Sequence, residues 1–267
     1  MQVRKMESTE PLRPFKEQYI RQATAPLDGM WLCGFVPMAT HFGLYDDSEL
    51  AGFFCVNDEG FLLQFFVAEG FRQRSSELFG RILQDGAAPV GPIRGAFVST
   101  AEPLYLSLCL DLFSKFEVNA LMYQHTGAPQ PESDLELTVL QLDHLSEAID
   151  FAIDSIGAPE DWLRGYYTNL IERRELFGLW QDDRLVAAGE SRGYDEYQVG
   201  YADVGIIVAK SERGRGLATR VLRQLVRDNE ARGLESICST ESTNLAAQKA
   251  IGRAGFFAGH RILRFSE

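Results

Sequence analysis

Cysteine is scarce in this sequence, and its few residues lie far apart. The four cysteines, Cys33, Cys55, Cys109 and Cys238, stand in apolar surroundings and form no CxxC pair. A disulfide framework or a zinc site needs closely patterned cysteines, so neither is expected, and we predict that all four are core thiols. The four histidines are equally scattered and lack a carboxylate or cysteine at ligand spacing. No metal site is predicted.

Basic residues and long apolar runs are also lacking. The chain has 26 lysines and arginines against 38 aspartates and glutamates, a formal net charge of −12. Nonspecific nucleic-acid binding needs a basic surface, so no nucleic-acid partner is expected, and the charge favours a cationic small substrate. The longest apolar run, Phe61–Ala68, is strand-sized, far short of the roughly 20 residues of a membrane span. The amino terminus has no secretory pattern. We therefore predict no membrane association and a cytoplasmic location.

The length of 267 residues fits two domains of ordinary size. Between them, residues 128–134 combine two prolines with polar residues directly after a glycine. This composition suits a solvated linker. The sequence therefore predicts a first domain over residues 1–127 and a second over residues 135–267.

The second half predicts the order strand, helix, helix, strand, strand. Apolar residues alternate over 135–139, as in a strand, and recur at helical spacing over 142–153. A second helix opens at 158 with a proline and two acids in its first turn. Two strand-like runs, 176–180 and 185–192, are joined by a polar turn typical of a hairpin.

A glycine-rich loop carries the strongest chemical signal. Residues 204–208 are predicted to form a buried strand, and Arg213–Ala218 then opens a helix. Glycines let the backbone approach an anion, and the first-turn amides of the helix point at it. Each such bond contributes roughly 1.5 to 3 kcal/mol, so a phosphate cradle is predicted. The loop does not match the dinucleotide-binding fingerprint, because Thr219 stands where that fingerprint has its third glycine or alanine. It does not match the Walker pattern of nucleotide-binding loops either.

Two motifs connect this loop to a known family. Arg213, Gly216 and Ala218 satisfy Gln/Arg-x-x-Gly-x-Gly/Ala, and the second motif, Asn-x-x-Ala and then Gly-Phe, is met by Asn244–Ala247 and Gly255–Phe256. The predicted second domain thereby resembles the GNAT superfamily of N-acyltransferases. The predicted order of strands and helices agrees with the GNAT fold, an α/β arrangement on a mixed sheet.

The resemblance implies that acetyl-CoA binds where two parallel strands splay, and that a primary amine of a small molecule or peptide attacks the thioester directly. The positions it assigns to acetyl-CoA are Ile206, Ile207, Val208, Arg213, Gly214, Arg215, Gly216, Leu217, Ala218 and Asn244. Asp203 occupies the strand position where many members carry a glutamate that deprotonates the amine, and burial would raise its pKa toward usefulness. A strand-end carboxylate without a catalytic part is the alternative.

One position departs from the family pattern. Many members place a tyrosine seven residues after the motif asparagine, where it protonates the departing thiolate, but here that residue is Ile251. Tyr166, Tyr167, Tyr201, Ser239 or solvent are the alternatives for this role. An N-acetyltransferase is favoured, and a noncatalytic acyl-CoA sensor is the other hypothesis.

The first half carries a fainter copy of the second. Three blocks align in one order at offsets of 135, 141 and 140: residues 42–47 with 177–182, 67–68 with 208–209, and 99–100 with 239–240. In this copy Ser75, Glu77 and Leu104 stand where Gly216, Ala218 and Asn244 do. A carboxylate beside a pyrophosphate repels it. We therefore predict a tandem GNAT protein with a degenerate first lobe, present as a monomer or weak homodimer.

Overall fold

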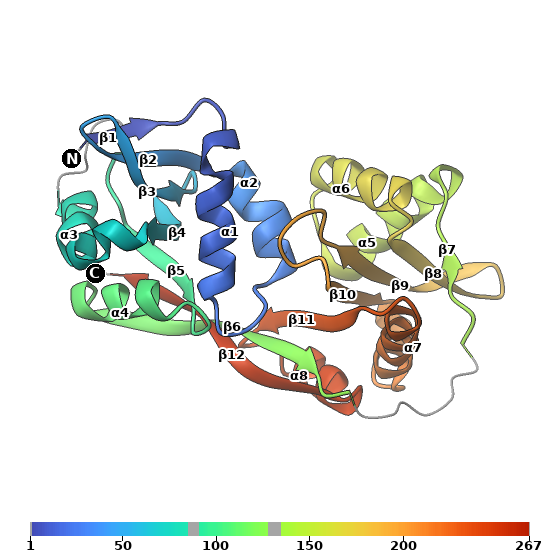
Figure 1. Ribbon diagram of the computed structural model, residues 1–267. Coiled ribbons are helices and arrows are strands. Elements are labelled where there is room, and N and C mark those ends of the chain that lie inside the picture. Colours follow the sequence, from blue (N-terminus) through green and yellow to red (C-terminus); the bar gives the residue numbers. More distant parts are fainter. Residues whose placement is uncertain (1, 85–90, 128–134, 267) are drawn as a thin grey trace. The chain divides into compact units, whose positions relative to one another are not determined.

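The computed structural model describes residues 2–84, 91–127 and 135–266 (Figure 1). It divides into two compact units: the first unit is Met1–Met122 with His260–Glu267, and the second unit is Tyr123–Gly259. The predicted linker, residues 128–134, lies outside the described residues, so a domain boundary there stays a prediction. The end of the chain, which we assigned from the sequence to the second domain, is part of the first unit.

The first unit is built on a mixed sheet. Its strands follow the order β1 (Gln2–Lys5), β2 (Thr40–Asp46), β3 (Glu49–Val56), β4 (Phe61–Val67), β5 (Gly95–Ser99) and β12 (Phe256–Ser266). Strands β1 to β4 pair antiparallel, β4 and β5 pair parallel, and the end of β12 pairs antiparallel with β5. The strand β6 (Lys115–His125) ends inside the second unit, where β12 begins. Residues from both ends of the chain therefore build one sheet.

Helices and aromatic side chains complete the first unit. The helical segments are η1 (Glu10–Leu12), α1 (Arg13–Gln22), η2 (Trp31–Phe35), α2 (Val36–Met38), η3 (Glu69–Arg74), α3 (Ser75–Gln84) and α4 (Pro103–Leu112). Every residue of β4 is buried, which confirms that the apolar run found in the sequence is a strand. Its Phe65 packs against Phe79 of α3 and Tyr105 of α4, with ring centroids 4.8 and 6.3 Å away.

The second unit follows the predicted order of elements. They are β7 (Thr138–Val139), η4 (Leu142–His144), α5 (Leu145–Ile156), α6 (Glu160–Glu172), β8 (Leu176–Gln181), β9 (Arg184–Gly193), β10 (Tyr201–Val208), η5 (Lys210–Glu212), α7 (Leu217–Ala231), β11 (Glu235–Glu241) and α8 (Leu245–Arg253). The predicted strand over residues 135–139 is reduced to β7. Asp182 and Asp183 form the predicted hairpin turn with φ of +48° and +58°, a conformation that aspartate tolerates in tight turns.

The sheet of the second unit is covered on both faces. Strands β7 to β10 pair antiparallel, and β11 pairs parallel with β10. Helix α7 lies on one face, where a Cβ on Gly189 would touch Leu225 and Val221. Helices α5 and α6 lie on the other face (Figure 1). Because successive side chains of a strand alternate between faces, Glu190, next to Gly189, points toward α5 and α6.

The cysteines differ in burial. Cys55, Cys109 and Cys238 are buried, as predicted, whereas Cys33 is exposed, so the prediction of a core thiol was wrong there. Cys33 lies in η2, a single turn whose packing against the sheet uses Trp31 instead. Within residues 2–84, 91–127 and 135–266, no helix is long and apolar enough to cross a membrane. The same residues contain no cluster of three or more His, Cys, Asp or Glu side chains suited to a metal ion.

Candidate functional site

Strands β10 and β11 separate soon after they begin. Their parallel pairing covers Tyr201–Asp203 and Glu235–Ile237, while β10 stays paired with β9 to its end. The amide of Ala209 donates to β9 at 2.9 Å. Because successive amides of a strand alternate between its two edges, those of Ile206 and Val208 point away from β9, into the gap that β11 leaves.

A cleft of about 730 Å³ occupies this gap. Its walls come from the end of α5, from β10 after Asp203, from the glycine loop with the start of α7, and from β11 and α8. The predicted acetyl-CoA positions that line it are Ile206, Ile207, Val208, Arg213, Gly214, Gly216, Leu217, Ala218 and Asn244. Arg215 does not line it, and its guanidinium pairs at 2.9 Å with Glu212, which does.

The glycine loop has the backbone of an anion site. Gly214 and Gly216 have φ of +79° and +78°, and a Cβ on either would meet no atom within 4 Å. Glycine is favoured here by conformation, since an L side chain is strained at such φ values. Gly216 precedes α7, and Arg220 is the first residue whose amide bonds back into the helix, to the carbonyl of Gly216 at 3.2 Å. The amides of Leu217–Thr219 therefore lack helical acceptors, and the helix dipole favours an anion beside them.

Arg213 braces the loop with its side chain. Its Nη2 donates to the carbonyl of Ser155 at 2.6 Å, and its Nε donates to that of Val208 at 3.3 Å. The guanidinium thus ties the loop to the ends of α5 and β10. The Oγ of Ser155 is buried without a hydrogen-bond partner among the described residues. Ser155 lines the cleft with other atoms, because this hydroxyl is itself buried.

Helix α8 brings two cations to the cleft. Asn244 caps this helix, with its Oδ1 accepting from the amide of Ala247 at 3.1 Å. Lys249 and Arg253, one helical turn apart, line the cleft. Neither residue was predicted from the sequence. The available signal was that two basic residues follow the asparagine motif four positions apart, since residues at this spacing share one helix face.

The position of the missing tyrosine lies at this cleft. Ile251 lines it and is buried. Of the four side chains considered as substitutes, Ser239 lines the cleft, whereas Tyr166, Tyr167 and Tyr201 do not.

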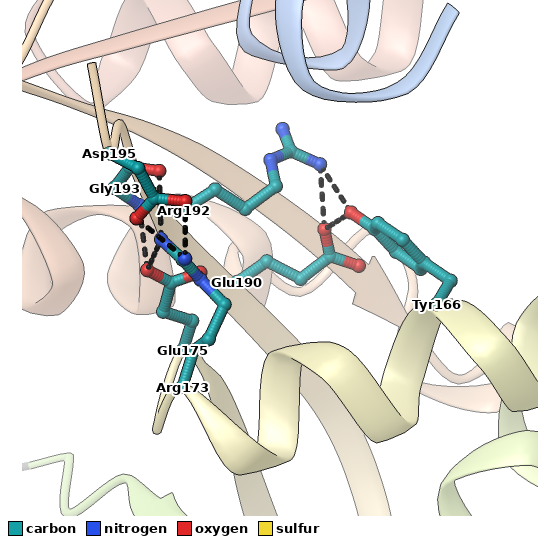
Figure 2. A network of polar contacts seen from close by, with 7 residues as sticks. All are labelled: Tyr166, Arg173, Glu175, Glu190, Arg192, Gly193 and Asp195. Atoms are coloured by element: carbon teal, nitrogen blue, oxygen red, sulfur yellow. Dashed lines mark hydrogen bonds and ion pairs between the residues drawn. The ribbon is translucent and has the colours of Figure 1, made fainter. Parts of the chain in front are cut away.

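A buried polar network lies on the α6 side of the same strands (Figure 2). Arg192 of β9 donates from Nη1 to Oη of Tyr166 at 2.7 Å and to Oε2 of Glu190 at 2.8 Å, and from Nη2 to Oδ1 of Asp203 at 2.8 Å. The Tyr166 hydroxyl donates to the same Glu190 oxygen at 2.6 Å. Burial alone would lower the pKa of Arg192, but the charges of Asp203 and Glu190 raise it well above its usual value. Arg192 therefore stays cationic.

Asp203, the predicted base, belongs to this network. It is 1% exposed and does not line the cleft. Its catalytic role stays a prediction. Glu190, which the sequence analysis did not identify, pairs in register with the cleft residue Gly205.

A second cluster of ion pairs lies beside this network, and of its charged members only Glu175 is buried (Figure 2). Arg173 donates to Glu175 at 3.0 Å and to Asp195 at 2.7 Å, and Glu175 accepts from the amide of Gly193 at 2.9 Å. This cluster fastens the end of β9 to the residue before β8. None of its members lines the cleft.

The corresponding loop of the first unit is built differently. Residues Glu69–Arg74 form η3, and Oγ of Ser75 donates to the carbonyl of Arg72 at 2.7 Å. Glu77 accepts from Arg74 at 3.3 Å. A short helix thus replaces the glycine loop, and a carboxylate stands in the first turn of α3, where the second unit has Ala218.

A mixed sheet with two splayed parallel strands and a glycine loop at a helix N-terminus defines an acyltransferase fold of the GNAT type. Two family models match the chain: Acetyltransferase (GNAT) domain over residues 8–126 and Acetyltransferase (GNAT) family over residues 143–256. An acetyltransferase of the GNAT family from Colwellia psychrerythraea is 48% identical, with a TM-score of 0.96, over 100% of this chain and 99% of that one. The chain belongs to the GNAT acetyltransferase family and carries two GNAT domains.

More distant structures share the fold. A tandem GNAT protein from the clavulanic acid biosynthesis pathway is 11% identical, with a TM-score of 0.62, over 100% of this chain and 98% of that one. A GCN5-related N-acetyltransferase from Sphaerobacter thermophilus is 14% identical, with a TM-score of 0.60, over 85% and 80% of the two chains. No curated protein matches the chain. The two family models that match successive halves of the chain confirm the expected tandem arrangement.

Proposed function

We propose that the second unit transfers the acetyl group of acetyl-CoA to a primary amine of a small molecule or peptide. Acyl transfer in general is the chemistry of the family. The observation that supports the finer proposal is the cleft between β10 and β11, which combines unpaired strand amides with a glycine loop at the start of α7.

Each part of acetyl-CoA has a counterpart in this cleft. The amides of Ile206 and Val208 would bond the pantetheine arm, and those of the loop and Leu217–Thr219 would hold the pyrophosphate. Lys249 and Arg253 supply positive charge that suits the remaining phosphate. This local charge is notable in a chain whose net charge is −12.

The chemistry then needs an oriented amine and a proton acceptor. The amine attacks the thioester carbon, and the thiol of CoA departs. In place of a family tyrosine, Ser239 or solvent would protonate the sulfur, which is a fair leaving group as a thiolate. Asp203 is the proton acceptor that the family position predicts, and no metal takes part in this scheme.

We further propose that the first unit binds no acetyl-CoA. Its loop amides are drawn into η3, and Glu77 would repel a pyrophosphate. Phe79 and Tyr105 fill the face of β4 around Phe65, where a ligand would need room. One lobe of the tandem then does the chemistry.

Thiol release from acetyl-CoA over a panel of amines tests the proposal. The full-length protein is expected to release CoA thiol only when a suitable amine is present, with an N-acetylated product of matching amount by mass spectrometry. Tight binding of acetyl-CoA without turnover for any amine would instead support the sensor hypothesis. Absence of acetyl-CoA binding would reject both.

A further inference from the structure

The carboxylate of Glu190 lies behind the part of the cleft wall that Gly205 forms, close to where β10 and β11 separate. Glu190 pairs in register with Gly205, which lines the cleft two residues after the last pairing of β10 with β11. A Cβ on Gly205 would come within 3.2 Å of Oε2 of Glu190. Because glycine has no side chain, only its backbone separates this carboxylate from the cleft wall.

The carboxylate is held by one oxygen. Oε2 accepts both from Tyr166 at 2.6 Å and from Arg192 at 2.8 Å (Figure 2). Oε1 has no hydrogen-bond partner among the described residues, and 8% of Glu190 is exposed. The donors therefore fix the orientation of the group and leave its second oxygen able to take a proton.

The charge around Glu190 favours a cationic amine. In the described structure, the ionisable groups that face Glu190 are Tyr166 and Tyr167 of α6 and Arg192 of its own strand. Asp203 of β10 is linked to Glu190 indirectly, because Arg192 donates to both carboxylates. The carboxylates of Glu190 and Asp203 share the one guanidinium of Arg192, so the formal charge of these three side chains is −1. Burial, followed by the charge of Glu190, raises the pKa of Tyr166, so its hydroxyl stays a donor.

We propose that Glu190, rather than Asp203, accepts the proton of the attacking amine through a water molecule, and that Tyr166 and Arg192 are its positioning residues. This inference rests on the proposed function of the same cleft. The amine nitrogen forms the bond to the acetyl carbon, and the carbon–sulfur bond breaks with its electron pair going to sulfur. An ammonium group and acetyl-CoA thus give an amide, CoA thiol and a proton that leaves through Oε1 to solvent.

The test compares Glu190→Gln with Glu175→Gln in the full-length protein. Both changes neutralise a buried carboxylate that accepts from an arginine, but only Glu190 lies behind the cleft residue Gly205. Glu190→Gln is expected to lower kcat on the order of 100-fold or more without changing acetyl-CoA affinity in calorimetry. Its rate should rise with pH as neutral amine accumulates, up to the pKa of the amine. Glu175→Gln should keep the wild-type pH profile.

Two adjacent tyrosines give a second comparison. Tyr166→Phe removes a donor to Oε2, so kcat should fall by roughly tenfold and the pH profile should move. Tyr167→Phe removes a hydroxyl that is buried without a hydrogen-bond partner among the described residues, and it should leave that profile in place. This pair keeps the inference testable even if Glu190→Gln fails to fold.

The possible results separate the two proposals. An active wild type whose Glu190→Gln and Tyr166→Phe variants keep its rate and pH profile would overturn the inference alone. The same holds if Asp203→Asn alone lowers kcat and gives a rate that rises with pH as neutral amine accumulates. A wild type that binds acetyl-CoA and acetylates no amine would overturn the proposed function, and the inference with it.

Discussion

Gly216→Glu places a carboxylate at the predicted phosphate cradle. Gly216 stands directly before α7 with φ of +78°, and a Cβ there meets no atom within 4 Å. The substitution therefore causes no clash. It introduces a negative charge at the helix N-terminus, where the pyrophosphate would otherwise be the anion.

The magnitude follows from the amides involved. The first turn of α7 offers the amides of Leu217–Thr219, and each bond to a charged oxygen contributes about 1.5 to 3 kcal/mol. Loss of two such bonds would cost about 3 to 6 kcal/mol, on the order of 10² to 10⁴ in Kd. In the wild type, acetyl-CoA at 100 times its Kd should raise the free energy of unfolding by about 2.7 kcal/mol. At the same concentration, the variant should gain almost nothing.

Thermal unfolding with and without acetyl-CoA measures this difference, and Gly233→Glu is the matched control. Gly233 follows the C-terminal end of the same helix, with φ of +73° and no atom within 4 Å of a Cβ. Both variants carry a backbone strain of about 1 to 2 kcal/mol, so both should unfold earlier than the wild type. Only Gly233→Glu should keep the shift caused by acetyl-CoA. A full shift in Gly216→Glu would refute the phosphate cradle.

Four further outcomes are expected. Burial raises the pKa of Glu102 from 4.5 to about 8, so the unfolded chain loses this proton first as the pH rises. The free energy of unfolding should therefore fall between those two pH values, and urea titrations should show that Glu102→Gln removes this fall. Replacing Lys249 and Arg253 with alanine should weaken the binding of CoA about tenfold more than that of dephospho-CoA, which lacks the phosphate outside the pyrophosphate. Equal weakening of both ligands in competition binding would contradict the assignment of these two residues to that phosphate. Calorimetric titration should give a stoichiometry near one acetyl-CoA per chain, and two similar sites would refute the degenerate first lobe. A fragment of residues 135–267 should aggregate or self-associate in light scattering, because the end of β12 would lose its partner β5 and expose an unpaired edge.

Local features of the site could be predicted from the sequence because contiguous residues create them. The glycine loop needs only two positive-φ residues followed by a helix start, and Asn244 caps the helix that begins beside it. The order of elements in the second unit likewise follows from apolar periodicity and turn residues within short windows. The same holds for the broken loop of the first unit, where Ser75 and Glu77 replace residues that an anion site needs.

Long-range pairing decided the rest. Glu190 and Gly205 are brought together by the register of β9 and β10, and a shift of one residue would turn Glu190 to the opposite face. Asp203 is paired by a buried arginine from the neighbouring strand, so its part in the network depends on that register too. The end of β12 joins the sheet of the first unit, although the motifs before it belong to the second. The sequence by itself determined the family and the glycine loop, because short motifs of contiguous residues carry both. Only the tertiary structure decided which carboxylate stands behind the cleft. The register of β9 and β10 sets the distance between Glu190 and Gly205, and no local sequence pattern encodes that register.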